Sequence, residues 1–239
     1  SAVSGAVNGT VTMLANGDIR FVPNANYHGP AEFTYTVSDG NGDTTDAKVN
    51  LSITAVNDAP VVVGEMVAAT EDTSFYIEAT GLLANDSDVD TATDGQVLSI
   101  SAVSAIAGQT HGSVSLVTQP DGTQQVQFTP DANYHGTATF NYTVSDGNGG
   151  ATTTTATIAL TNVNDAPVAT GETVNSSEDQ ILTITASALL QNDSDIDNAR
   201  ADLTISRVQS GTGGTVSLNA SGNVVFTPTA NYNGTATFT

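Results

Sequence analysis

The chain has 239 residues, no cysteine and a formal net charge of −21, because 25 acidic side chains stand against 4 basic ones. So acidic a surface excludes nucleic acid and anionic membranes as partners, since both are bound through cations at the protein surface. It attracts cations instead, and without disulfides a bound metal ion is one remaining way to stabilise small secreted domains. No apolar run approaches the length of a membrane span, so we expect no membrane insertion in this segment.

Alternating polarity predicts short strands along the chain. Ala138, Phe140, Tyr142 and Val144 alternate with polar residues, as expected for a half-buried antiparallel strand. In chain order, we expect strands at 47–55, 61–69, 74–80, 96–104, 113–118, 123–129, 137–145 and 156–160. Seven short strands in about 105 residues predict an all-β fold of tandem immunoglobulin-like, seven-strand sandwiches.

A long internal repeat organises the chain. Asn26–Gly29 recurs at 133–136, and Phe33–Gly42 recurs at 140–149, both with an offset of 107 residues. A third Asn-Tyr motif begins at Asn231, where shorter loops reduce the offset to 98 residues. Loops absorb such deletions and strands do not, so the repeat corresponds to a structural domain.

Three units follow from this repeat. Residues 1–56 form the C-terminal part of one repeat, 57–162 form a complete repeat, and 163–239 form a repeat that lacks its C-terminal end. Because the chain begins and ends within a repeat, we expect it to be a segment of a longer tandem array. Its neighbouring repeats are then its first partners.

An Asn-Tyr motif precedes the sixth strand of each unit. Tyr27, Tyr134 and Tyr232 stand where sandwiches often carry a corner tyrosine that hydrogen-bonds to the backbone, and we assign them this structural role. A histidine follows the first two tyrosines, but Asn233 replaces it in the third copy. We therefore interpret that position as a turn residue and not as a metal ligand.

Acidic residues gather at the two ends of each predicted sandwich. If the strands are lettered A to G, loops BC and FG lie at the leading end, where the chain enters the domain, and loops AB and EF lie at the trailing end. The predicted metal ligands are Asp86, Asp88, Asp90 and Asp146 at the leading end, Glu71, Asp72 and Asp131 at the trailing end, the connectors Asn57-Asp58 and Asn164-Asp165, and in the last unit Glu178, Asp193, Asp195 and Asp197.

So many carboxylates repel one another unless a counter-ion lies among them. Ca²⁺ takes six to eight oxygen ligands from carboxylates, amides and backbone carbonyls, which matches this set. Mg²⁺ fits less well because it prefers strict octahedra with retained water, and Zn²⁺ prefers nitrogen or sulfur ligands. The sequence therefore predicts calcium at the junctions between repeats.

Five motifs in order resemble the bacterial cadherin-like repeats, of tandem-95 or VCBS type, found in giant secreted RTX-type adhesins. They are Val56–Pro60, Glu71–Thr73, Leu82–Asp90, Phe128–Gly136 and Phe140–Gly149. The resemblance implies cadherin-like sandwiches in an extended rod, export to the bacterial cell surface, and a role as an extender in cell adhesion or biofilm formation. It also implies junction ligands at Glu71, the loop at Asp131, Asn164-Asp165, and Asp193 with Asp195.

The leading hypothesis for function is a calcium-rigidified spacer of a cell-surface adhesin or extracellular filament, with other surface molecules or copies of itself as further candidate partners. A carbohydrate-binding sandwich module is the alternative, although no Trp exists and most Tyr and Phe fall on inward-facing positions. No nucleophile, base and acid set is recognisable, so we expect no enzymatic activity.

Overall fold

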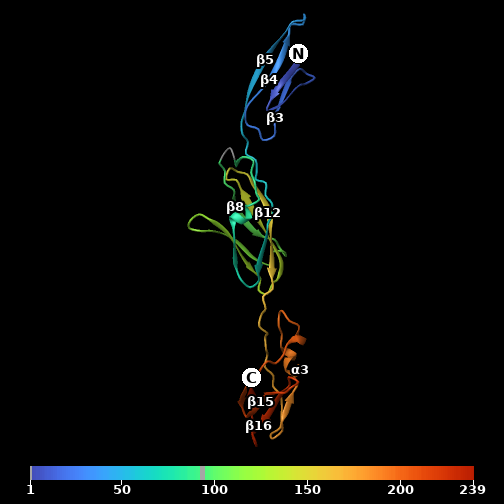
Figure 1. Ribbon diagram of the computed structural model, residues 1–239, viewed down its shortest axis with the longest axis vertical. Helices are drawn as coiled ribbons and strands as arrows, with labels where there is room; N and C mark the ends of the chain where they lie inside the picture. The colour runs from blue at the N-terminus through green and yellow to red at the C-terminus, as the bar shows by residue number, and fades with distance from the viewer. Residues whose placement is uncertain (1, 92–94) are drawn as a thin grey trace. The chain divides into compact units, whose positions relative to one another are not determined.

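Strands supply nearly all the regular structure of the computed structural model, which describes residues 2–91 and 95–239 (Figure 1). The chain forms two compact units, Ser1–Leu160 and Thr161–Thr239. The predicted all-β class is confirmed.

Most of the segment 57–162, which is called the complete repeat below, lies in the first unit, and this segment forms two sheets. One sheet has the order β7-β10-β9, formed by Phe75–Glu78, Gln124–Pro130 and Gly112–Thr118. The other has the order β6-β12-β11-β8, formed by Met66–Thr70, Ala151–Thr161, Gly136–Ser145 and Ser99–Ala105. Strand β11 pairs antiparallel with β12 and β8, and β10 pairs antiparallel with β7 and β9. These seven strands confirm the predicted sandwich.

Its core lies between the two sheets. Phe140, Tyr142 and Val144 of β11 are fully buried, as their alternation with polar residues predicts. Phe128 comes from the opposite sheet, and its ring centroid lies 6.2 Å from that of Phe140. Burial of each large apolar side chain contributes roughly 1.5–3 kcal/mol, so this row of inward residues holds the sheets together.

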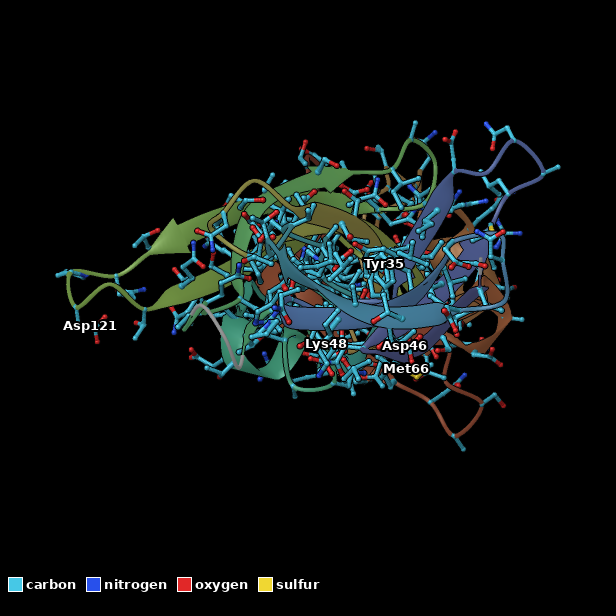
Figure 2. The ribbon with its side chains drawn as sticks, turned by 90° about the horizontal axis from the view of Figure 1, so that it is seen from above. Tyr35, Asp46, Lys48, Met66 and Asp121 are labelled. Atoms are coloured by element: carbon cyan, nitrogen blue, oxygen red, sulfur yellow. The ribbon has the colours of Figure 1, made fainter. Side chains whose placement is uncertain are left out.

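The N-terminal part of the first unit has a smaller arrangement of the same kind. Strands β1 (Ala2–Val7), β4 (Gly29–Ser38) and β5 (Thr44–Ile53) form a sheet in the order β1-β4-β5, and β2 (Gly9–Met13) pairs with β3 (Ile19–Pro23). Phe21 and Phe33 stack with centroids 6.1 Å apart. Lys48 on β5, labelled in Figure 2, pairs with Glu32 at 2.8 Å, but the pair is exposed and adds little stability.

The second unit has one three-stranded and one two-stranded sheet. The first has the order β13-β16-β15, formed by Leu182–Ile184, Val224–Pro228 and Gly214–Leu218. The second pairs β14 (Ser210–Thr212) with β17 (Thr237–Phe238). The short helices are α3 (Ala186–Leu189), η1 (Leu190–Asn192) and η2 (Arg200–Asp202).

Two predicted strands are shorter than their sequence patterns. The segment predicted at 61–69 forms a strand only from Met66, because Val61 pairs instead with Ser87 of the BC loop in an isolated bridge. The strand predicted at 74–80 ends at Glu78, where the helical turn α1 (Ala79–Leu82) begins and carries the buried Leu82 into the core.

The second unit also lacks a strand equivalent to β6 among residues 169–181. In the complete repeat, β6 pairs with β12, and no equivalent of β12 lies within 161–239. An isolated edge segment without that hydrogen-bonding partner does not form a ladder.

The corner tyrosines have the predicted structural role. The hydroxyl groups of Tyr134 and Tyr232 donate to the carbonyl oxygens of Thr137 and Thr235, at 2.9 and 2.8 Å, and Tyr27 donates to that of Pro30 in the same way. The bond therefore reaches three residues forward, to the start of the sixth strand. In the complete repeat, His111 stacks on Tyr134 with a centroid distance of 3.9 Å.

Candidate metal centre

The FG loop of the complete repeat is built around Asp146, whose side chain is 2% exposed. Its Oδ1 accepts hydrogen bonds from the backbone N–H groups of Asn148, at 2.7 Å, and of Gly150, at 3.0 Å. Gly147 and Gly149 have φ values of 81° and 108°, which only glycine adopts readily, so the tight turn depends on them. The result is a buried carboxylate held at the leading end.

The connector is attached to this carboxylate and to the BC loop. The Nδ2 of Asn57 donates to Asp146 Oδ2 at 2.7 Å, and the Nε2 of Gln96 donates to Asn57 Oδ1 at 2.8 Å. The backbone N–H of Asp58 donates to Asp90 Oδ2 at 2.7 Å. The connector is therefore held by the repeat that follows it.

The BC loop is ordered by its own aspartates. The N–H of Asp90 donates to Asp88 Oδ1 at 2.8 Å, and the N–H of Val63 donates to Asp86 Oδ1 at 2.9 Å. Val61 and Ser87 exchange two backbone hydrogen bonds, of 2.8 and 3.0 Å. We call the set of side chains at this leading end the connector cluster: Asn57, Asp58, Asp86, Asp88, Asp90, Gln96 and Asp146.

The second unit repeats this arrangement at its own leading end. The N–H of Asp165 donates to Asp197 Oδ2 at 2.6 Å, and the N–H of Asp197 donates to Asp195 Oδ1 at 2.8 Å. Asp193 Oδ1 accepts from the N–H of Thr170 at 2.8 Å, as Asp86 does from Val63. The side chain of Asn164 donates to the carbonyl oxygen of Asp165 at 2.9 Å. The Asp-x-Asp-x-Asp spacing thus encodes the same loop twice.

Hydrogen bonding favours the charged form of Asp146 and of Asp195. The pKa of Asp146 is lowered chiefly by the bond from Asn57, and further by the N–H groups of Asn148 and Gly150, against a smaller opposing effect of burial. The pKa of Asp195 is lowered chiefly by the N–H of Asp197, with Asn198 adding to it. Both carboxylates are anionic at neutral pH.

Three buried oxygens of the connector cluster have no hydrogen-bond partner among the described residues: Asp86 Oδ2, Asp88 Oδ2 and Gln96 Oε1. A buried polar atom without a partner costs about 1–3 kcal/mol, and more if it is charged. The sequence offers no Lys or Arg between Asn57 and Asn162 to meet these oxygens. A hard cation with oxygen ligands meets this need, so the donor set fits Ca²⁺.

Carboxylates alone do not complete a site. Within residues 2–91 and 95–239, no group of three or more His, Cys, Asp or Glu side chains comes together as a metal centre. A bound ion therefore needs amide and backbone oxygens beside the aspartates, which is usual for Ca²⁺.

The predicted ligands of the trailing end have structural tasks of their own. Glu71 is 1% exposed, and its Oε2 lies 3.8 Å from His135 Nδ1. Asp72, at φ 58°, accepts from the N–H of Asn133 at 2.7 Å. The side chain of Asp131 is exposed, while its backbone N–H donates to the carbonyl of His111 at 2.9 Å.

In the last unit, the exposed Glu178 is followed by Asp179, which accepts from the N–H of Asn231 at 2.8 Å. Asp179 is not among the ligands predicted from the sequence, although it follows Glu178 as Asp72 follows Glu71. Its positive φ of 61° matches the 58° of Asp72, so the AB loop is also conserved in shape between the two units.

Glu65 is a second residue that the sequence did not reveal. The buried hydroxyl of Tyr142 donates to Glu65 Oε2 and also contacts the carbonyl oxygens of Val63 and Leu82, at 3.1 and 3.2 Å. Burial raises the pKa of Glu65 above its usual range, the Tyr142 bond opposes this, and the Asp86 charge adds to it. Burial and Glu65 together raise the pKa of Tyr142.

Some acids serve only as turns. Asp121, at the tip of the hairpin between β9 and β10 (Figure 2), accepts from the N–H and the hydroxyl of Thr123, at 3.0 and 2.7 Å. The hydroxyl bond is the main reason that the pKa of Asp121 is lowered. A solvated Asp-Gly turn of this kind needs no cation.

Comparison with known proteins gives a family match along the chain. The profile of the cadherin-like domain matches residues 1–54, 56–161 and 163–239. No curated protein sequence matches. No helix within the described residues is long and apolar enough to cross a membrane.

Several solved structures are similar at low identity. The ectodomain of protocadherin gamma C5, domains 1–3, is 14% identical, with 93% of this chain and 75% of that chain covered and a TM-score of 0.40. Protocadherin gamma B2, domains 1–5, is 12% identical, with 96% of this chain and 46% of that chain covered and a TM-score of 0.42. An endo-fucoidan hydrolase of glycoside hydrolase family 107 is 17% identical, with 96% of this chain and 34% of that chain covered and a TM-score of 0.30. This chain thus spans less than half the length of the last two structures.

Proposed function

Because the chain belongs to the cadherin-like domain family, we propose that it is a calcium-rigidified extender of a large bacterial cell-surface adhesin or extracellular filament. In this role it supports cell adhesion or biofilm formation from outside the cell. Its partners are calcium and the neighbouring repeats of the same chain, with copies of itself or other surface molecules as further candidates.

The observation that carries the proposal is the connector cluster. The carboxylate of Asp146 is held in the anionic form, buried oxygens of Asp86 and Asp88 lack donors among the described residues, and the surrounding sequence has no basic side chain. The same loop recurs in the second unit. A feature repeated at each connector is expected of a joint and not of a single binding or catalytic site.

The cluster suggests how the joint works. We propose Asp58, Asp86, Asp88, Asp90 and Asp146 as ligands, which would bind ions together with amide and backbone oxygens and not as one all-carboxylate group. Calcium supplies a multivalent positive charge that links carboxylates from separate loops. The chain's own hydrogen bonds, from Asn57 to Asp146 and from Asp58 to Asp90, keep the connector on the following repeat. Glu71, Asp72 and Asp131 of the complete repeat, and Glu178 of the last one, are further proposed ligands at the trailing ends of their own repeats.

The carbohydrate-binding alternative has no specific observation in its favour. Phe128, Phe140 and Tyr142 are buried in the core, and Tyr134 is tied to the backbone and covered on one face by His111. The faces of these four rings are thus used within the fold, whereas Tyr76 on β7 is 52% exposed.

Thermal melting with and without calcium tests the proposal. At a free concentration 100 times the dissociation constant, one bound ion stabilises the folded state by about 2.7 kcal/mol. For domains of this size, that raises Tm by roughly 10–20 °C. Addition of a chelator is expected to remove the gain, and magnesium at equal concentration to restore little of it. A Tm unchanged by chelation would contradict calcium rigidification.

A further inference from the structure

Gln96 is the one neutral side chain of the connector cluster that is almost fully buried, with 8% exposure. It lies shortly before β8 in the chain. Its Nε2 donates to Asn57 Oδ1, and its Oε1 is buried without a hydrogen-bond partner among the described residues. No metal-ligand pattern in the sequence points to this residue.

The orientation of this amide follows from its neighbours. An ionised carboxylate only accepts hydrogen bonds, so Asn57 must present its NH₂ group to Asp146 Oδ2, 2.7 Å away. Asn57 Oδ1 then faces Gln96, which must in turn present its own NH₂ group. The chain of amides therefore leaves Gln96 Oε1 as the free oxygen.

The same chain makes Asn57 a poor ligand. Its Nδ2 is engaged by Asp146 and by the carbonyl oxygen of Asp58, and its Oδ1 is engaged by Gln96. The side chain of Gln96, by contrast, offers a buried oxygen in a stretch without Lys or Arg, and its amide is linked through Asn57 to the Asp146 carboxylate. Amide oxygens are among the ligands that Ca²⁺ takes.

We propose that Gln96 Oε1 is a ligand of the cation bound by the connector cluster, and that Asn57 positions Gln96 and Asp146 instead of binding the ion. This inference rests on the proposed function and names the amide ligand of the same site. It also distinguishes the two joints. Leu98–Ile100 aligns with Leu203–Ile205, so Ala201 stands in place of Gln96 in the second unit, which lacks this oxygen.

Calorimetric titration of the full chain with calcium chloride tests the assignment. Gln96→Ala is expected to weaken one class of sites about tenfold and to leave the others unchanged, as loss of a single contributing group does. Gln96→Glu, which keeps the length and adds charge, is expected to bind calcium more tightly than Gln96→Ala. Gln127→Ala, on β10, is the matched control and is expected to bind as the wild type does.

The outcomes separate the two proposals. If the wild type takes up no calcium, the proposed function fails, and the ligand assignment fails with it. If the wild type binds calcium and a folded Gln96→Ala chain binds with unchanged affinity at every site, only the assignment is overturned. Should Gln96→Ala not fold, Gln96→Glu decides, since affinity equal to that of the wild type would overturn the assignment.

Discussion

Asp146 should stabilise the leading end even without metal. Substitution Asp146→Ala removes the acceptor for three donors: the N–H groups of Asn148 and Gly150, and the Asn57 amide. A hydrogen bond to a charged group contributes about 1.5–3 kcal/mol. The full sum for the three bonds is not lost, because water can bond to some of the donors once the carboxylate is gone. We therefore expect a loss of about 3 kcal/mol in the free energy of unfolding of the complete repeat. That corresponds to a fall in Tm of roughly 10–20 °C.

Scanning calorimetry in chelator measures this loss, and hydrogen exchange of the connector locates it. Asp39 is the matched control, because its Oδ1 also accepts from two loop N–H groups, those of Asn41 and Asp43, but it is exposed. Asp39→Ala is expected to cost less than about 1 kcal/mol. Equal losses for the two variants, or protection of the connector unchanged in Asp146→Ala, would refute the argument that the buried carboxylate holds the connector.

Two further predictions concern the corner tyrosine and Glu65. Tyr134→Phe removes the bond to Thr137 but keeps the ring on His111, so we expect a loss of about 1 kcal/mol, measured by urea unfolding; no loss would refute the corner role. The pKa of Glu65 is raised in the folded state, so its contribution to stability is present at low pH and is lost as pH rises through that pKa. Glu65→Gln is therefore expected to be more stable than the wild type at neutral pH in chelator, by roughly 0.5 kcal/mol because the site is only partly buried. The stability difference between Glu65→Gln and the wild type should shrink as pH falls. A difference that grew as pH falls would contradict a raised pKa of Glu65 in the folded state.

The sandwich was predictable because its signals are local and repeated. The alternation through Phe140 and Tyr142 fixed which side of β11 faces the core, and the recurrence of the Asn-Tyr motif located the corner. The strand limits were less predictable. Val61 belongs to an apolar run in the sequence, but it pairs with Ser87 and not with the strand that β6 pairs with. Such a contact between segments far apart in the sequence cannot be read from local alternation.

The acidic half of the connector cluster was also predictable, since the Asp-x-Asp-x-Asp spacing recurs at each connector. Its amide half was not. Gln96 has no repeated counterpart, and its role depends on hydrogen bonds that run through Asn57 to Asp146. Gln96 and Asn57 are 39 residues apart in the sequence, and Asn57 and Asp146 are 89 residues apart. Glu65 escaped prediction for the same reason, because only the fold brings it to Tyr142.

Small-angle X-ray scattering of the full chain, with calcium and with chelator, tests the central claim most directly. If calcium rigidifies the joints, the profile with calcium will fit an extended rod with a narrow range of dimensions, and the profile in chelator will fit a bent, flexible chain. Superimposable profiles in the two conditions, from samples shown by calorimetry to be calcium-loaded and calcium-free, would contradict it.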